Sequence, residues 1–130
     1  MVGNFGTCLA DHLADMGNQV TIWARDRLMV ESINAHHINS KYMPDVVLSA
    51  NLKASSKLDA ELIQSHTVIL MSIPTQHMRS ILQQIKPHLT LQHLIIFVNK
   101  GIETSTLQLP SDIATQELGA DMGIQVIIQL

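Results

Sequence analysis

The stretch Leu94-Ile95-Ile96-Phe97-Val98 decides the fold, because five consecutive apolar residues predict a strand that is buried on both faces. A second solid apolar run occurs at 68–71, and a short β-branched strand is predicted at 20–23. Weaker strand patterns lie at 52–54 and 124–128. Strands of this kind are typical of parallel sheets that helices cover on both sides.

Helical patterns alternate with these strands along the chain. A helix is predicted over 7–16, and Asp26 is placed to cap a second one. Pro74 opens a third helix, whose apolar residues recur at helical spacing, and Pro110 suits the first turn of a fourth. The alternation predicts an α/β fold with a doubly wound, mostly parallel sheet of the Rossmann-like type.

Composition narrows the class of protein. The chain has 130 residues, of which 46% are hydrophobic and 15% charged, which suits a single folded domain. A net charge of -3 argues against nucleic acid as a partner. No apolar run reaches the roughly 18 residues of a membrane span. Since Cys8 is the one cysteine, we expect no internal disulfide and a cytoplasmic location.

A glycine-containing turn, Val2-Gly3-Asn4-Phe5-Gly6-Thr7, is predicted immediately before the first helix. Glycine there allows a dinucleotide's pyrophosphate to approach the backbone, and the helix N-terminus then offers N–H groups to the anion. Ordinary glycine turns have the same local pattern, so the motif alone leaves both interpretations open. The first glycine of G-x-G-x-x-G would fall at Met1, and the strand before it is missing. We therefore expect unpaired edges on the strands at 20–23 and 68–71.

Six segments, in order over nearly the whole chain, resemble a known family. They are Gly3-Asn4-Phe5-Gly6-Thr7, Val20-Thr21-Ile22-Trp23-Ala24-Arg25-Asp26, Ile33-Asn34 through Asn39-Ser40-Lys41-Tyr42-Met43-Pro44, Asn51-Leu52-Lys53-Ala54-Ser55-Ser56, Ile73-Pro74-Thr75-Gln76 and Asn99-Lys100-Gly101-Ile102-Glu103. The ending Glu117-Leu118-Gly119 also resembles the helix end before the family's last strand of this region. Together they resemble the NAD(P)-dependent glycerol-3-phosphate dehydrogenases of the bacterial type. The resemblance implies an oxidoreductase that interconverts glycerol 3-phosphate and dihydroxyacetone phosphate for glycerophospholipid synthesis. Its cofactor would be NADP or NAD.

The resemblance implies a set of cofactor-binding residues. They are Gly3, Asn4, Phe5, Gly6, Arg25, Pro74, His77 and Lys100. Arg25 follows the second strand of the family's fold, where the adenosine ribose is read, and its guanidinium can fork onto a 2′-phosphate. This favours NADP without excluding NAD; the alternative for Arg25 is a solvated surface charge. Lys100 would also contact the substrate, glycerol 3-phosphate.

The resemblance also implies what the chain lacks. We expect residues 1–130 to be a single NAD(P)-binding domain, truncated at both ends, because the family's first strand and its C-terminal catalytic domain are missing. No catalytic residue is assigned in this fragment, so we expect no measurable turnover from the polypeptide alone. Dehydrogenase activity above a purified blank would contradict that expectation.

The sequence argues against a metal site and leaves two alternatives to this function open. Seven histidines are scattered without carboxylate or cysteine partners at ligand spacing, so no metal site is predicted. One alternative is a non-catalytic dinucleotide-binding module. Another is a non-functional truncated remnant that folds only as a homo-oligomer or not at all, which the missing central strand favours.

Overall fold

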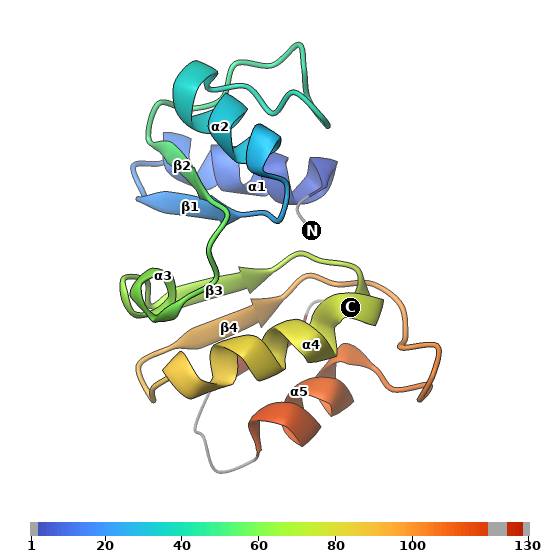
Figure 1. The fold of residues 1–130 in the computed structure, drawn as a ribbon. Coiled ribbons are helices and arrows are strands. Elements are labelled where there is room, and N and C mark those ends of the chain that lie inside the picture. Colours follow the sequence, from blue (N-terminus) through green and yellow to red (C-terminus); the bar gives the residue numbers. More distant parts are fainter. Residues whose placement is uncertain (1–2, 120–124, 129–130) are drawn as a thin grey trace. The chain divides into compact units, whose positions relative to one another are not determined.

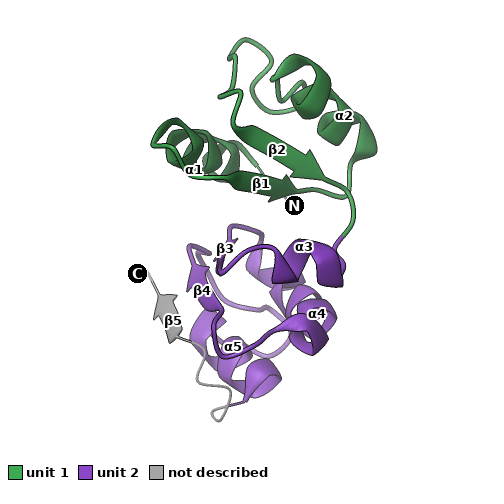
Figure 2. Ribbon diagram, turned by 90° about the vertical axis from the view of Figure 1, so that its left-hand side faces the viewer, with its two compact units in different colours: residues 1–57 green, residues 58–130 purple. Residues whose placement is uncertain are grey.

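A computed structural model describes residues 3–119 and, through their backbone, residues 125–128 (Figure 1). The chain divides into two compact units, Met1–Lys57 and Leu58–Leu130 (Figure 2). Each unit is a parallel α/β structure, as the alternation of apolar strands and helices predicted.

Unit 1 consists of two helices packed on a pair of parallel strands. In chain order these are α1 (Asn4–Asp15), β1 (Val20–Trp23), α2 (Arg27–His36) and β2 (Leu52–Ser55). The strands pair in register from Val20 opposite Leu52 to Trp23 opposite Ser55. Small residues on α1, Ala10 and Ala14, let that helix lie close to the apolar residues of the strands and of α2.

The first helix begins earlier than the sequence pattern indicated. Asn4, Phe5 and Gly6 form the first turn of α1 and not a loop ahead of it, and Gly3 is the N-cap. A first helical turn makes no intrahelical N–H bonds of its own, so a polar and glycine-containing segment can adopt it without an apolar pattern. The turn expected before the helix is therefore part of the helix.

Unit 2 contains three parallel strands in the order β3-β4-β5. Its elements are α3 (Ala60–Gln64), β3 (Val68–Met71), α4 (Thr75–Ile85), a 3₁₀ turn η1 (Lys86–His88), β4 (Leu94–Phe97), α5 (Pro110–Leu118) and β5 (Gln125–Ile128). The helical spacing predicted for α4 is confirmed, since its apolar residues are all buried. They are Met78, Ile81, Leu82 and Ile85. Ile95 and Phe97 of β4 and Ile113 of α5 complete the buried set.

β1 and β3 each lie at an edge of their sheet. β1 pairs with β2 alone, and β3 pairs with β4 alone, among the strands that the structure describes. These are the two edges that the sequence predicted to be unpaired. Val68, at the start of β3, is 50% exposed. In the same described ranges, no helix combines the length and apolar character that crossing a bilayer requires.

Asp26 caps α2, as the sequence predicted. Its carboxylate accepts hydrogen bonds from the backbone N–H groups of Leu28 (3.1 Å) and Met29 (3.3 Å), and Lys41 Nζ lies 3.5 Å away. The hydrogen bond from Met29, followed by the contacts with Lys41, lowers the pKa of Asp26 below its usual value. The cap is therefore strongest when Asp26 is ionised.

Removal of this cap gives a first prediction. Asp26→Ala is expected to lower the Tm by a few degrees at pH 7, whereas Asp26→Asn, which can still cap, changes it less. Because the folded-state pKa is lowered, the carboxylate stabilises the fold above its unfolded pKa and loses this effect as pH falls through the folded pKa. Thermal denaturation at pH 7 and about pH 3 measures both effects. Equal Tm values for wild type and Asp26→Ala at pH 7 would contradict the assignment.

Candidate dinucleotide site

The start of α1 is open to an anionic ligand. No side chain caps this end of the helix, since the N-cap residue is Gly3. The backbone N–H groups of Asn4, Phe5 and Gly6 have no carbonyl ahead of them in the helix. Phe5 is 60% exposed, so this turn is not covered by the rest of unit 1. Free amides at the positive end of a helix dipole favour a phosphate.

Gly3 is not a glycine that the protein's own structure requires. Its φ is -101°, an extended conformation that any residue adopts. A Cβ built on Gly3 would meet no atom within 4 Å among the described residues, its two chain neighbours aside. Neither backbone strain nor internal packing therefore accounts for glycine at this position. Open space in front of free helix amides is the arrangement that close approach of a ligand needs.

A buried hydrogen-bond network holds this first turn in place. Thr7 Oγ1 donates to the Gly3 carbonyl (2.9 Å) and accepts from Asn39 Nδ2 (2.9 Å). Asn39, which is fully buried, accepts through Oδ1 from the N–H groups of Lys41 (3.3 Å) and Tyr42 (3.2 Å). The sequence singles out Asn39-Ser40-Lys41-Tyr42 only through its resemblance to the family. The structure shows that Asn39 ties the loop after α2 to the glycine turn.

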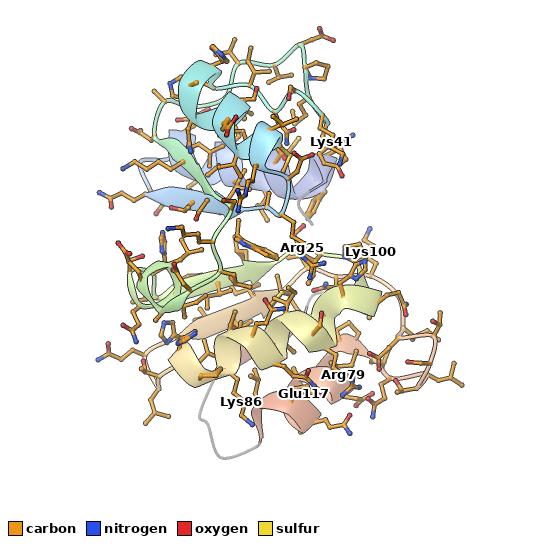
Figure 3. All side chains as sticks on the ribbon, viewed as in Figure 1. Arg25, Lys41, Arg79, Lys86, Lys100 and Glu117 are labelled. Carbon is orange, nitrogen blue, oxygen red and sulfur yellow. The ribbon has the colours of Figure 1, made fainter. Side chains whose placement is uncertain are left out.

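Arg25 follows the end of β1 and is exposed. Its guanidinium lies 5.9 Å from the ring centroid of Trp23, and no acidic side chain pairs with it in the described part of unit 1. Lys41, by contrast, is paired with Asp26. Figure 3 labels both cations, and Figure 1 shows the first turn of α1 and the end of β1 toward the same side of unit 1.

In unit 2, the expected residues gather beyond the carboxyl ends of β3 and β4. Pro74 is the N-cap of α4, His77 lies in its first turn, and Lys100 follows β4 (Figure 3). Thr75 Oγ1 donates to the Lys100 carbonyl (3.0 Å), which joins the start of α4 to the loop that carries Lys100. This loop, residues 98–109 between β4 and α5, is called the Lys100 loop below. Lys100 itself is exposed.

Sequence reasoning missed an ionic cluster beside this loop. Arg79 of α4 forms a two-pronged pair with Glu103 of the Lys100 loop, with Nε to Oε1 at 3.1 Å and Nη2 to Oε2 at 2.8 Å. It also pairs with Glu117 of α5 and hydrogen bonds to Gln108 (2.6 Å) and Gln116 (2.9 Å). Figure 3 shows Arg79 reaching from α4 toward Glu117. One guanidinium thus connects two helices and a loop.

The cluster fixes the ionisation of its members. The hydrogen bond from Arg79 lowers the pKa of Glu103, and a second one from Thr106 acts in the same direction. The pKa of Glu117 is lowered mainly by its hydrogen bond with Arg79. The two carboxylates in turn raise the pKa of Arg79. Glu103 is 5% exposed, so it depends on this arginine for its charge to be tolerated in the fold.

No group of three or more histidine, cysteine or acidic side chains is placed to hold a metal ion within the described ranges. Each unit presents an exposed cation at the carboxyl ends of its strands, Arg25 in unit 1 and Lys100 in unit 2, and neither has an acidic partner among the residues that the structure describes. Ligands of open α/β sheets bind at these strand ends. The strand ends of each unit, taken by itself, therefore suit an anionic group.

The chain is similar to one protein family and to curated members of that family. The model of the NAD-dependent glycerol-3-phosphate dehydrogenase N-terminus matches residues 2–128. A glycerol-3-phosphate dehydrogenase [NAD(P)+] of Leptospira biflexa is 41% identical over 116 residues, which are 89% of this chain and 34% of that protein. The enzyme of Oleidesulfovibrio alaskensis is 39% identical over 116 residues, 89% of this chain and 35% of its own. The chain thus spans about a third of the length of these relatives.

Solved structures agree on the fold. The crystal structure of glycerol-3-phosphate dehydrogenase from Coxiella burnetii matches with a TM-score of 0.83 at 27% identity, over 98% of this chain and 37% of that one. The Saccharomyces cerevisiae glycerol-3-phosphate dehydrogenase matches with a TM-score of 0.80 at 30% identity, over 97% of this chain and 38% of that one. Both similarities extend over nearly every element described above.

Proposed function

Because the chain belongs to the NAD-dependent glycerol-3-phosphate dehydrogenase family, whose N-terminal model matches residues 2–128, we propose that it binds NADP or NAD as the cofactor-binding part of such an oxidoreductase. The observation that carries this proposal is the open turn at Gly3, where free helix amides face space that a Cβ would otherwise enter. Dinucleotide-binding folds are built from two βαβαβ halves, each with three parallel strands. Unit 2 has three parallel strands and unit 1 has two, a division into two α/β parts that favours one functional domain over residues 1–130.

The residues at the start of α1 fit the pyrophosphate. Gly3 leaves room for its oxygens, and the N–H groups of Asn4, Phe5 and Gly6 would donate to them. A pyrophosphate carries the negative charge that the end of a helix dipole stabilises. The buried Asn39–Thr7 hydrogen bond keeps this turn in shape before the ligand arrives. Such pre-organisation lowers the ordering cost of binding.

Arg25 fits the adenosine end of the cofactor. It follows β1, it is exposed, and no carboxylate neutralises it among the described residues. A guanidinium binds a phosphate with two parallel hydrogen bonds, whereas it gains less from a 2′-hydroxyl. We therefore assign Arg25 to the 2′-phosphate and expect a preference for NADP.

This assignment gives a prediction on cofactor preference. Arg25→Ala is expected to weaken NADPH binding about 10- to 30-fold and to change NADH binding less than about threefold. Lys53→Ala is the matched control, because Lys53 is an exposed cation in the middle of β2, away from the strand ends. Isothermal titration of the three proteins with both cofactors measures the difference. An equal loss of affinity for NADPH and NADH would rule out the 2′-phosphate role.

Lys100, Pro74 and His77 are assigned to the nicotinamide side of the cofactor. They lie where strands β3 and β4 end, and Lys100 is an exposed cation that a substrate phosphate would attract. The substrate that we propose is glycerol 3-phosphate, with dihydroxyacetone phosphate as the product, in glycerophospholipid synthesis. The bound cofactor supplies the hydride acceptor. The residues described here bind and orient, and none of them is proposed to transfer a proton.

The whole reaction is proposed for a protein of the length of the relatives, of which this chain covers about a third. The 130-residue polypeptide is expected to bind the cofactor without turnover. A cytoplasmic location is favoured by the single, unpaired Cys8. Homo-oligomer formation is proposed on the open edges of β1 and β3.

A further inference from the structure

A polar stripe runs along α4 next to its buried apolar face. Gln76, Arg79 and Gln83 occupy positions i, i+3 and i+7, so they lie on one side of the helix. Each of them hydrogen bonds to a segment distant in sequence. Gln76 and Arg79 contact the Lys100 loop, whereas Gln83 contacts Glu117 of α5 alone (3.1 Å). The stripe therefore contains two residues that hold the loop and a similar one that does not.

Gln76 hydrogen bonds to the loop close to Lys100. Its Nε2 donates to the Ile102 carbonyl (2.7 Å), and its Oε1 accepts from both the N–H and the hydroxyl of Thr104 (3.0 Å each). Thr75, one residue earlier, donates to the carbonyl of Lys100 itself. The first turn of α4 thus hydrogen bonds to the loop at Lys100, Ile102 and Thr104. A side-chain amide that donates through its nitrogen and accepts through its oxygen restrains both the position and the distance of the loop.

The loop needs such support because its backbone is not in a relaxed conformation. Leu107 has a positive φ of 59°, which is costly for a leucine, whereas Gly101 adopts its φ of 96° without strain. Arg79 holds the segment between them through Glu103, whose side chain also accepts from Thr106. Surrounding contacts must over-determine a backbone of this kind.

We propose that Gln76 and Arg79 are positioning residues for Lys100: they hold the loop so that its ammonium group stands where an anionic ligand needs it. Neither residue is proposed to touch the ligand. The consequence for affinity depends on the function proposed for Lys100, whereas the consequence for the loop does not. Gln76 is the better test of the two, because it is exposed, carries no charge and can be replaced in a helix by alanine without loss of packing.

The experiment compares Gln76→Ala with Gln83→Ala in the 130-residue chain. Both remove an exposed glutamine from the same stripe, but Gln83 makes no contact with the Lys100 loop in the described structure. Backbone amide order parameters for residues 100–104 are expected to fall from about 0.85 to below about 0.6 in Gln76→Ala and to stay unchanged in Gln83→Ala. The Kd for NADPH is expected to rise about fivefold in Gln76→Ala and less than about 1.5-fold in Gln83→Ala. Arg79→Lys, which keeps the charge without the fork, is expected to loosen the loop partially.

Each outcome of this experiment either supports or overturns the positioning role of Gln76. Equal order parameters in the two alanine variants would overturn the proposal, and so would a loosened loop with the affinity of wild type. If the wild-type chain binds neither NADPH nor NADH, the proposed function fails. The order parameters then still show whether Gln76 holds the loop. A loss of order parameters throughout the chain in Gln76→Ala would indicate a general structural role and would also overturn the proposal.

Discussion

Replacing Gly3 with valine is expected to weaken NADPH binding by at least about 100-fold, which corresponds to about 2.7 kcal/mol. The valine side chain would stand in front of the first turn of α1, where we place the pyrophosphate. The fold is expected to tolerate this change, because Gly3 has negative φ and a Cβ there meets no atom within 4 Å among the described residues beyond its chain neighbours. The Tm is therefore expected to fall by no more than a few degrees, the cost of a poorer N-cap residue.

Gly3→Ser is the control for this experiment. Serine also adds a Cβ, but its hydroxyl can cap the free amides of α1, so its Tm is expected to equal or exceed that of wild type. It should nevertheless bind NADPH more weakly, because its hydroxyl competes for the same N–H groups. Titration calorimetry and thermal denaturation measure the two quantities separately. Wild-type affinity in Gly3→Val would place the pyrophosphate elsewhere.

Replacing Arg79 with methionine is expected to lower the Tm by roughly 10 °C at pH 7. Methionine retains much of the arginine's length but leaves the buried carboxylate of Glu103 and the nearby Glu117 without their cation. Removal of one partner from a buried ion pair costs more than the pair contributes, because the remaining charge is uncompensated. Arg27→Met is the control, since Arg27 is an exposed arginine on α2 with no ion pair in the described structure.

The same variant should weaken the pH dependence of stability. In the wild type, Arg79 lowers the pKa of Glu103 below its usual value near 4.5, so the pair stabilises the fold above that pH and loses this effect as pH falls through the folded pKa. In Arg79→Met, the hydrogen bond from Thr106 still lowers the pKa of Glu103 and burial opposes it, so the pKa lies closer to its usual value than in the wild type. The variant should then lose less stability than Arg27→Met when the pH falls from about 5 to about 3. Parallel pH profiles of the two variants would contradict this account.

The strands were predictable because solid apolar runs leave little choice of boundary. The runs at 20–23 and 68–71 coincide with β1 and β3, and 94–98 differs from β4 by one residue. The start of α1 was not predictable in this way, because Asn4-Phe5-Gly6 has no apolar period. Its helical form depends on the buried contact between Thr7 and Asn39, 32 residues apart.

The residues of the candidate site also divide into those that the sequence locates and those that it does not. Residues that follow a strand, Arg25 and Lys100, can be located from the sequence because the strand ends locate them. Arg79 could not, since its acidic partners lie 24 and 38 residues further along the chain. Its position beside the apolar stripe of α4 resembles any solvated charge. Only the folding of the Lys100 loop and of α5 onto α4 identifies it as a member of a cluster.

The central claim, that this chain binds a nicotinamide dinucleotide, is tested most directly by titration calorimetry of the purified 130-residue polypeptide with NADPH and with NADH. We expect saturable heat with both and a tighter Kd for NADPH, together with a rise in Tm at saturation. Absence of heat and of a thermal shift with either cofactor would contradict the claim.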